Sequence, residues 1–336
     1  MQCEPSVDSE KMALATLTVC LLAAIHVVVS VEAPKAGLND GNMIPTLALG
    51  TYSTNESDRA NMRQTIIDAI EAGYRHIDTA SLYKNEEEIG QGIADVIKKG
   101  LVKREDLFIT TKLWNDKHAF DQVVPALKES LKRLGLDYVD LYLIHTPGAQ
   151  KADGTFDNID YLDTWRGMQE AKKQGLAKSI GVSNFNSAQI QRIIDNSEIV
   201  PAVNEIEVHP ALTQERLISF CQDKGITVMA YSPFGFMVAR DVQDAPPPRI
   251  DEPVLVDIGK KYGKSTSQVV LRYLIDRGTI PIPKSTNKSR LQQNIDVFDF
   301  KLTPEEIVTI SKFNQNRRVL DNSDWKDHPY YPFNMD

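Results

Sequence analysis

The sequence predicts a single α/β domain built as a closed (β/α)8 barrel over residues 36–336. Short strand-forming runs alternate with amphipathic helical segments over about 250 residues, and no Pro-, Gly- or Ser-rich linker interrupts them. The alternative, a doubly wound sheet, would need a G-x-G-x-x-G turn between a strand and a helix. The only Gly-x-Gly, at Gly90 to Gly92, lies inside a predicted helix, where close packing explains it better.

The strands are expected after a short hairpin, whose turn sequence Asn39-Asp40-Gly41 follows Ala36 to Leu38. Loops at the carboxyl ends of barrel strands form active sites, so we expect the site in the longer irregular stretches. These are Thr146–Asn158, Phe234–Pro253 and Asn314–Asp336. The barrel strands are β-prone runs bounded by turn residues: Thr46–Leu49, His76–Asp78, Phe108–Leu113, Val139–His145, Ser179–Ser183, Val203–Glu207, Thr227–Tyr231 and Ile280–Ile282.

Helices fill the intervals between the strands. Apolar residues recur at three-and-four spacing in Phe120–Leu134, with charges on the opposite face, which is typical of a helix that covers a sheet. Capping boxes begin two helices, at Ser265 and at Thr303. The predicted helices are Asp58–Ala72, Glu86–Lys98, Phe120–Leu134, Ile159–Gln174, Ser187–Asn196, Gln214–Lys224, Val254–Tyr262, Thr266–Arg277, Lys288–Asn294 and Pro304–Phe313.

Composition and charge exclude several classes of protein. The chain has 336 residues, of which 42% are hydrophobic and 25% charged, as in ordinary globular proteins. Its net charge is −8, and no run of five or six Lys or Arg offers a site for nucleic acid or anionic lipid. We therefore expect no nucleic-acid partner. The spacing of His and Cys also indicates no sequence-local metal site.

The first thirty residues differ from the rest of the chain. Residues Met12 to Val31 carry no formal charge at neutral pH, and polar residues flank them on both sides. This pattern predicts a signal peptide over residues 1–30, and hence a secreted protein with no membrane partner after cleavage. The basic residues before it are limited to Lys11, so an uncleaved signal anchor and a true start at Met12 are alternatives. Cleavage would leave Cys221 as the single cysteine and exclude an intrachain disulfide.

Ionisable residues stand at or just after the ends of three consecutive predicted strands. Asp78 ends the second strand, Lys112 lies near the end of the third, His145 ends the fourth, and Tyr83 follows the second. Because barrel strands end on one face, these side chains are expected to converge. An ammonium group lowers the pKa of a nearby phenol, and a carboxylate holds the ammonium in place. Tyr83, Lys112 and Asp78 thus form a candidate proton-donor relay, with His145 orienting a carbonyl oxygen.

Five longer motifs resemble those of the aldo-keto reductase family, and the resemblance runs from about Gly37 to the C-terminus. The motifs are Gly73–Tyr83, Thr111–Trp114, Asp140–His145, Ile180–Phe185 and Ile282–Ser285. The resemblance implies a (β/α)8 barrel, often monomeric, that reduces a small-molecule aldehyde or ketone with NADPH. It implies that Asp78, Tyr83, Lys112 and His145 are the catalytic tetrad. In this family Tyr83 would donate the proton while hydride passes from nicotinamide C4 to the carbonyl carbon.

The resemblance also implies the cofactor-binding positions. Ser183 and Asn184 match residues that hold the nicotinamide carboxamide, and Tyr231 matches the tyrosine that stacks on the nicotinamide ring. A lysine, a hydroxyl and an arginine beside a helix start suit the extra phosphate of NADPH. The remaining matches are Thr51, a further cofactor contact, and Lys284, Ser285, Arg290 and Asn294, around the adenosine 2′-phosphate and adenine.

Two positions depart from the family pattern. Glu205 stands where the family usually has Gln beside the nicotinamide carboxamide, and its negative charge is expected to favour NADP+. Thr146 stands where aldose reductases commonly carry Trp, which predicts a wider pocket or a local hydrogen bond to the backbone. A wide pocket would suit secreted family members that reduce 3-dehydroecdysone, a ketosteroid. The candidate pocket walls are Tyr52, Trp114, Phe120, Thr146 and Trp325.

Export would make two glycosylation sequons relevant, at Asn55 and Asn287. Asn55 lies in a polar loop, whereas Asn287 lies between Ser285 and Arg290, where a glycan would obstruct the phosphate site. We therefore predict a glycan on Asn55 and none on Asn287. The alternative to an enzyme is a non-catalytic NADP(H)-binding barrel that acts as a regulatory or structural subunit. The intact tetrad favours the enzyme.

Overall fold

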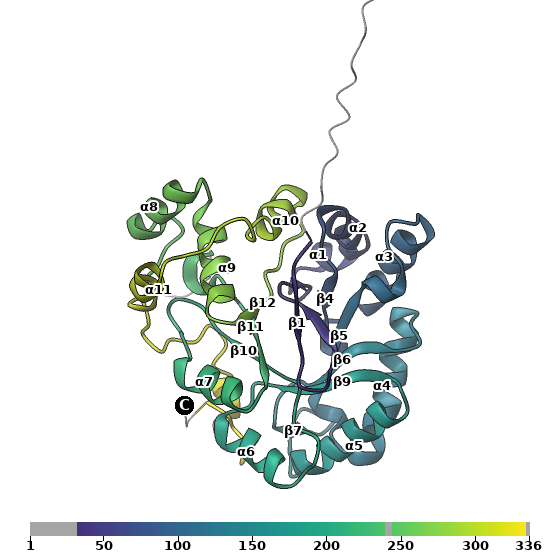
Figure 1. Ribbon diagram of the computed structural model, residues 1–336. Coiled ribbons are helices and arrows are strands. Elements are labelled where there is room, and N and C mark those ends of the chain that lie inside the picture. Colours follow the sequence, from purple (N-terminus) through teal and green to yellow (C-terminus); the bar gives the residue numbers. More distant parts are fainter. Residues whose placement is uncertain (1–31, 239–243, 334–336) are drawn as a thin grey trace, which may run out of the picture.

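The computed structural model describes residues 32–238 and 244–333, so the predicted signal peptide lies outside the described residues. Its centre is a sheet of eight parallel strands in the order β12-β11-β10-β9-β6-β5-β4-β3. The two edge strands also meet: Ala48 donates a backbone hydrogen bond to Pro281, and Gly50 donates one to Pro283. These bonds close the sheet, which confirms the predicted barrel (Figure 1).

The barrel strands are short and almost entirely buried. Four of them, β4, β5, β10 and β11, have the bounds that the sequence predicts, and the others differ by one to three residues at an end. The strands are β3 (Leu49–Gly50), β4 (His76–Asp78), β5 (Phe108–Leu113), β6 (Val139–Ile144), β9 (Ala177–Ser183), β10 (Val203–Glu207), β11 (Thr227–Tyr231) and β12 (Thr279–Pro281).

Two small hairpins accompany the barrel. Strands β1 (Lys35–Gly37) and β2 (Met43–Pro45) pair antiparallel around the predicted Asn39–Gly41 turn, so the expected N-terminal hairpin is confirmed. Strands β7 (Ala149–Gln150) and β8 (Phe156–Asp157) form a second antiparallel pair inside a stretch predicted to be irregular.

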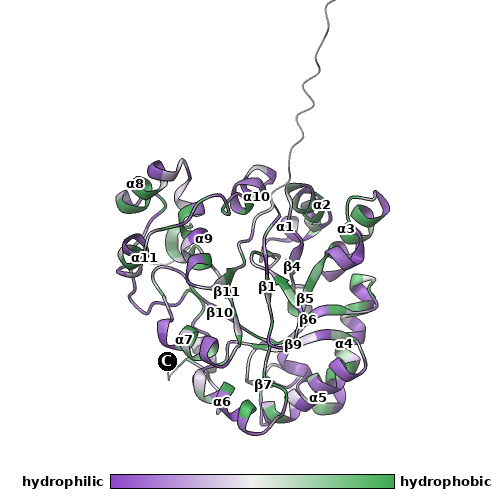
Figure 2. Ribbon diagram, viewed as in Figure 1, coloured by the Kyte–Doolittle hydropathy of each residue, from purple (hydrophilic) through white to green (hydrophobic). Residues whose placement is uncertain are grey.

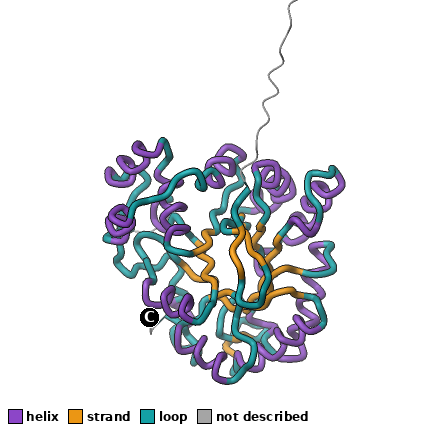
Figure 3. The backbone as a smooth tube through the Cα atoms, in the orientation of Figure 1, coloured by secondary structure: helices purple, strands orange, loops and turns teal. Residues whose placement is uncertain are grey.

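Helices surround the strands on the outside of the barrel (Figure 3). The predicted helix Asp58–Ala72 is wrong in its continuity, because Asn55 caps an earlier start and the backbone breaks at Asn61. The helices are α1 (Glu56–Ala60), α2 (Met62–Ala72), α3 (Glu86–Lys98), α4 (Phe120–Leu134), α5 (Tyr161–Lys173), α6 (Ser187–Asp195), α7 (Glu215–Asp223), α8 (Pro253–Tyr262), α9 (Thr266–Asp276), α10 (Lys288–Ile295) and α11 (Pro304–Ser311).

The helices bury one apolar face against the strands and expose a polar one, and both kinds of residue are visible along them in Figure 2. Both predicted capping boxes are present, at Ser265 before α9 and at Thr303 before α11. Within the described ranges, no helix combines the length and the hydrophobicity needed to cross a membrane.

Candidate active site

The strand register brings the predicted catalytic residues to one end of the barrel. Asp78, the last residue of β4, pairs with Thr110 of β5, two residues before Lys112. Tyr83 ends a short 3-10 helix directly after β4, and His145 directly follows β6. The elements that carry them, β4, β5 and β6, are neighbours in the sheet. The convergence expected from the sequence is therefore present.

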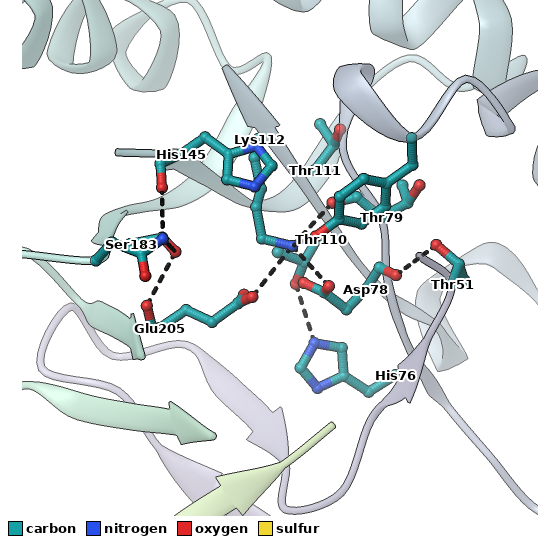
Figure 4. Close-up of polar contacts among 12 residues, drawn as sticks. Thr51, His76, Asp78, Thr79, Thr110, Thr111, Lys112, His145, Ser183 and Glu205 are labelled. Carbon is teal, nitrogen blue, oxygen red and sulfur yellow. Dashed lines mark hydrogen bonds and ion pairs between the residues drawn. The ribbon is translucent and has the colours of Figure 1, made fainter. Parts of the chain in front are cut away.

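Lys112 is the centre of the cluster, and its side chain is fully buried. Its Nζ lies 2.6 Å from Asp78 Oδ1 and 3.3 Å from Tyr83 Oη. It also donates to the backbone oxygen of Thr79 at 3.1 Å and lies 3.2 Å from Glu205 Oε1. Figure 4 shows these contacts converging on one nitrogen atom. The expected contacts among Asp78, Lys112 and Tyr83 are thus present, and Glu205 joins them.

The pKa of Tyr83 is raised overall, although the sequence leads us to expect that Lys112 lowers it. Burial raises it above its usual value, and the neighbouring carboxyl groups of Asp78 and Glu205 raise it further. Lys112 lowers it, as the sequence predicts, but does not outweigh the other effects. Tyr83 is therefore neutral at physiological pH, with its proton available for donation.

His145 lies beside Tyr83, with the ring centroids 5.7 Å apart and the rings edge to face. Its pKa is held well below its usual value, first by burial and then by Lys112 and His118. Its Nδ1 is buried with no hydrogen-bond partner in the described part of the chain. A neutral imidazole carries one N–H and can donate it to a carbonyl oxygen. This geometry suits the orienting role predicted for His145.

Four residues predicted to lie around the nicotinamide form a hydrogen-bonded set next to the cluster: Ser183, Asn184, Glu205 and Tyr231. Asn184, which adopts a positive φ of 60°, donates from Nδ2 to the backbone oxygen of His145 at 3.0 Å. Tyr231 donates to Asn184 Oδ1 at 2.7 Å, and Ser183 Oγ donates to the backbone oxygen of Glu205 at 2.9 Å. On the opposite side Thr51 donates to the backbone oxygen of Asp78 at 2.9 Å. These side chains are thus fixed before any ligand binds.

The predicted adenosine-binding residues lie apart from the cluster, after β12 and in α10. Arg290 is exposed in the first turn of α10, whereas Ser285 and Asn294 are buried. Lys284 forms an ion pair with Asp58 of α1. Lysine and arginine side chains at the start of a helix are donors that suit a phosphate group.

A cavity of about 130 Å³ lies beside the cluster. Of the predicted pocket walls, Trp114, Thr146 and Trp325 line it, together with Tyr330 and neighbouring C-terminal residues. Thr146 Oγ1 also lies 2.9 Å from Asn115 Oδ1, the nearer acceptor of its single proton, and 3.3 Å from the backbone oxygen of Gly148. Its side chain therefore lines the pocket and makes a local hydrogen bond as well.

Two predicted pocket walls lie outside this cavity. Phe120 is 48% exposed at the start of α4, where Arg166 lies over its ring, and it does not line this cavity. Tyr52 is also half exposed, but its ring packs on that of Tyr83, with centroids 5.1 Å apart.

One carboxylate that was not predicted from the sequence binds the C-terminal segment that contributes to the cavity. Glu207, the last residue of β10, accepts hydrogen bonds from the backbone N–H groups of Val319 and Leu320. It also bonds His209 Nε2 at 2.8 Å. The sequence did contain a signal for Glu207, because it is the last residue of a predicted strand, as Asp78 is.

Comparison with known proteins shows which family the sequence matches. The family model for the Aldo/keto reductase family matches residues 46–315, a span that includes every candidate catalytic and cofactor-binding residue. Aldo-keto reductase AKR2E4 of Bombyx mori is 63% identical over 306 residues, which are 90% of this chain and 99% of that protein.

Two solved structures agree with the fold. The crystal structure of Bombyx mori AKR2E4 in complex with NADP has a TM-score of 0.89 at 64% identity, and covers 90% of this chain and 99% of that chain. Aldo-keto reductase AKR2E5 of the same silkworm, complexed with NADPH, has a TM-score of 0.88 at 44% identity, and covers 90% and 94%.

Proposed function

This chain belongs to the aldo/keto reductase family, and from that premise we propose that it uses NADPH to reduce an aldehyde or ketone to the alcohol. The observation that carries the proposal is the buried ammonium of Lys112, 2.6 Å from Asp78 and 3.3 Å from the phenol of Tyr83. An ammonium in this position stabilises the negative charge that develops on the phenol oxygen as its proton leaves.

Each residue of the cluster has a distinct part in this chemistry. Bound NADPH supplies a hydride to the carbonyl carbon. Tyr83 donates its proton to the carbonyl oxygen, and neutral His145 holds that oxygen by a hydrogen bond. Asp78 holds Lys112 against the phenol. A positioned acid of this kind contributes about 10²–10⁴-fold to the rate.

The donor set fits NADPH at both ends of the molecule. Asn184 and Ser183 offer side-chain amide and hydroxyl groups near the reacting end, and Lys284 and Arg290 offer cations at the start of α10. The solved relatives described as complexes with NADP and NADPH support the same cofactor.

The test is NADPH oxidation over a panel of aldehydes, quinones and ketosteroids, with Tyr83→Phe as the control. We expect turnover by the wild type and a loss of about 10²–10⁴-fold in kcat for Tyr83→Phe, with NADPH affinity retained. No turnover by the wild type on any substrate, or equal activity of the variant, would overturn the catalytic assignment. NADPH binding without turnover would instead indicate the non-catalytic barrel.

We infer further that the substrate is bulky, with a ketosteroid as the class to test. The small side chain of Thr146 supports this, because a tryptophan there would fill part of the cavity. The C-terminal residues around Tyr330 line the same cavity, so their position also affects how large a substrate can enter. Thr146→Trp should lower kcat/KM for ketosteroids at least tenfold more than for small aldehydes. An equal effect on both would contradict the inference.

We propose, on the sequence pattern of residues 12–31, that the enzyme is exported and glycosylated at Asn55. Asn55 and Asn287 are both exposed, and both cap helices through Oδ1, at α1 and α10. N-terminal sequencing of secreted material should begin near residue 31, whereas an uncleaved chain in the membrane fraction would indicate an anchor. Peptide mapping that found a glycan on Asn287 of NADPH-binding enzyme would contradict the placement at Asn55 alone.

A further inference from the structure

The active-site cluster contains one more buried acid than the reaction needs. Asp78 and Glu205 flank the single ammonium of Lys112, at 2.6 Å and 3.2 Å. The side chains of the two acids are 3% exposed and that of Lys112 is fully buried. If both acids were ionised, the site would hold an uncompensated negative charge away from water, which is strongly unfavourable.

The second carboxyl oxygens of Asp78 and Glu205 independently indicate that the two acids are not both ionised. Asp78 Oδ2 and Glu205 Oε2 are both buried, and neither has a hydrogen-bond donor within the described residues. The two carboxyl groups also lie within hydrogen-bonding reach of each other. Two ionised carboxylates have no proton to place between them. A single proton shared by the two carboxyl groups would allow a hydrogen bond between them and leave the site neutral.

The other titratable groups around the pair do not supply a second cation. They are His76 of β4, Tyr83 after β4, His145 after β6 and Tyr231 of β11, and Tyr231 is itself near Glu207 and Arg318. Burial lowers the pKa of His76 to about 3, and the pKa of His145 is also lowered, so both rings are neutral. Lys112 is thus the one cation that contacts the pair in the part of the chain described here.

We propose that Asp78 and Glu205 share one proton at neutral pH, and that Glu205 is a positioning residue which stores this proton for the relay. Burial raises the pKa of both carboxyl groups, most strongly that of Glu205, which agrees with a protonated pair. A protonated Glu205 also regains the hydrogen-bond donor that distinguishes an amide from a carboxylate.

The stored proton has a use in the reaction, and this part rests on the proposed function. Tyr83 gives its O–H proton to the carbonyl oxygen as the hydride adds to carbon, which leaves a phenolate. Lys112 Nζ, 3.3 Å away, returns a proton to the phenolate, and the shared proton of Asp78 and Glu205 then restores the ammonium. The site ends with a neutral Tyr83, a charged Lys112 and two carboxylates, and regains one proton from water between turnovers.

Infrared spectroscopy tests the shared proton without reference to activity. At neutral pH the wild type should show a carboxylic-acid C=O stretching band, distinct from the carboxylate bands, that shifts when glutamate is labelled with ¹³C. Glu205→Gln should lose the band, and so should Asp78→Asn, which leaves Glu205 paired with Lys112 alone. Glu198→Gln, the same change at an exposed site, should retain it. A wild type without the band, or a band unchanged in Glu205→Gln, would overturn the proposal.

A pH profile then separates storage of the proton from the reaction itself. Loss of the shared proton leaves a negative charge next to Tyr83, so reduction by the wild type should slow at alkaline pH. Glu205→Gln should lack this alkaline limb, while its KM for the carbonyl stays within about twofold. The band without turnover on any substrate would refute the proposed function and leave the shared proton standing. Turnover without the band would refute the shared proton alone.

Discussion

Glu205 is the side chain by which this site departs most from the family pattern, and it should distinguish the two redox states of the cofactor. The resemblance places it beside the nicotinamide, which is positively charged only in NADP+. A positive ring nearby favours the ionised acid, so NADP+ binding should release the stored proton and NADPH binding should not. Glu205→Gln should weaken NADP+ binding about tenfold, the equivalent of about one pKa unit, and leave NADPH binding nearly unchanged.

Isothermal titration calorimetry in buffers of different ionisation enthalpy measures both quantities. Proton release by the wild type on binding NADP+ should disappear in Glu205→Gln. Unaltered dissociation constants for both redox forms in the variant would contradict the role given to this carboxyl group.

Asp58 is expected to compete with the cofactor for Lys284. The two side chains form an ion pair that lowers the pKa of Asp58, and Ser53 Oγ donates to the same carboxylate at 3.0 Å. A phosphate at Lys284 must share or displace this partner. Because the pair is partly exposed, its contribution is about 0.5–1 kcal/mol, so Asp58→Asn should raise NADPH affinity about twofold to fivefold. Equilibrium titration should show this gain for NADPH and none for NADH, which lacks the 2′-phosphate; equal gains would argue against the competition.

The catalytic residues were predictable because they sit at the ends of consecutive strands, where position in the sequence implies position in the barrel. The contact between Glu205 and Lys112 was not. Strands β10 and β5 are separated in the sheet by β9 and β6, so the two side chains meet across the barrel interior. No local pattern in the sequence encodes such a contact. The exposure of Phe120 was also not predictable, since an aromatic residue near a helix start carries no signal of which surface it faces.

The contact between α3 and α4 depends on a missing side chain. A Cβ added to Gly90 would lie 2.5 Å from the backbone oxygen of Leu134, at the end of α4. Backbone atoms cannot move aside as the end of a side chain can, so Gly90→Ala should destabilise the protein by about 1–3 kcal/mol. In an exposed helix the same change would instead stabilise by about 1 kcal/mol.

Urea denaturation of the wild type and Gly90→Ala measures this difference. Gly37→Ala is a control, since its new Cβ would meet only the Sδ atom of Met43, at 4.0 Å. A Gly90→Ala protein as stable as the wild type would show that the two helices can separate at no cost.

Glu207 holds the C-terminal segment to the barrel. We expect this attachment to fix the position of the C-terminal residues that line the pocket. The carboxylate accepts the N–H groups of Val319 and Leu320, close in sequence to Trp325, which lines the cavity. Charged acceptors form stronger hydrogen bonds than neutral ones, by about twofold. Glu207→Gln should therefore speed limited proteolysis within residues 314–333 and raise KM more than it lowers kcat. Unchanged cleavage together with an unchanged KM would mean that the segment is held by other contacts.

Elements with strong periodic patterns were predicted well, whereas the two-residue strands β7 and β8 were not. The sequence has the apolar stripe of α4 and the capping box of α11, and both appear as expected. Strands β7 and β8 have two residues each, too few to show alternation of apolar and polar side chains. The break between α1 and α2 arises from a single residue, Asn61, whose backbone leaves the helical region.

For the molecule as a whole, the barrel could be predicted because eight similar units repeat and the fold rules allow few ways to close them. What the repeat could not indicate is which titratable side chains the closed barrel buries. His76 and His118 are both buried, and burial lowers the pKa of each ring to about 3. Stability in acid therefore also depends on buried groups such as His118, which lies outside the five motifs.

His118 provides the sharpest test of this acid sensitivity. Both of its ring nitrogens are buried without a hydrogen-bond partner in residues 32–238 and 244–333. Its pKa is 6.5 in the unfolded chain and about 3 in the fold, so the unfolded state binds the proton first as the pH falls. The contribution of neutral His118 to stability is thus complete above about pH 6.5 and is lost between there and pH 3. Between pH 7 and pH 5 the loss is about 2 kcal/mol.

His118→Phe should therefore lose about 2 kcal/mol less of its free energy of unfolding than the wild type does between pH 7 and pH 5. Phenylalanine gives up no hydrogen bond there, so the variant should also be at least as stable as the wild type at pH 7. The shared proton of Asp78 and Glu205 increases the free energy of unfolding as the pH falls. This effect is the same in both proteins and cancels in the difference between them. Val308→Ala, at an exposed site, should keep the wild-type pH dependence. If the free energies of unfolding of the wild type and His118→Phe changed equally with pH, His118 would take up its proton over the same pH range in the folded and the unfolded protein. Its surroundings in the barrel would then be more polar than its contacts indicate.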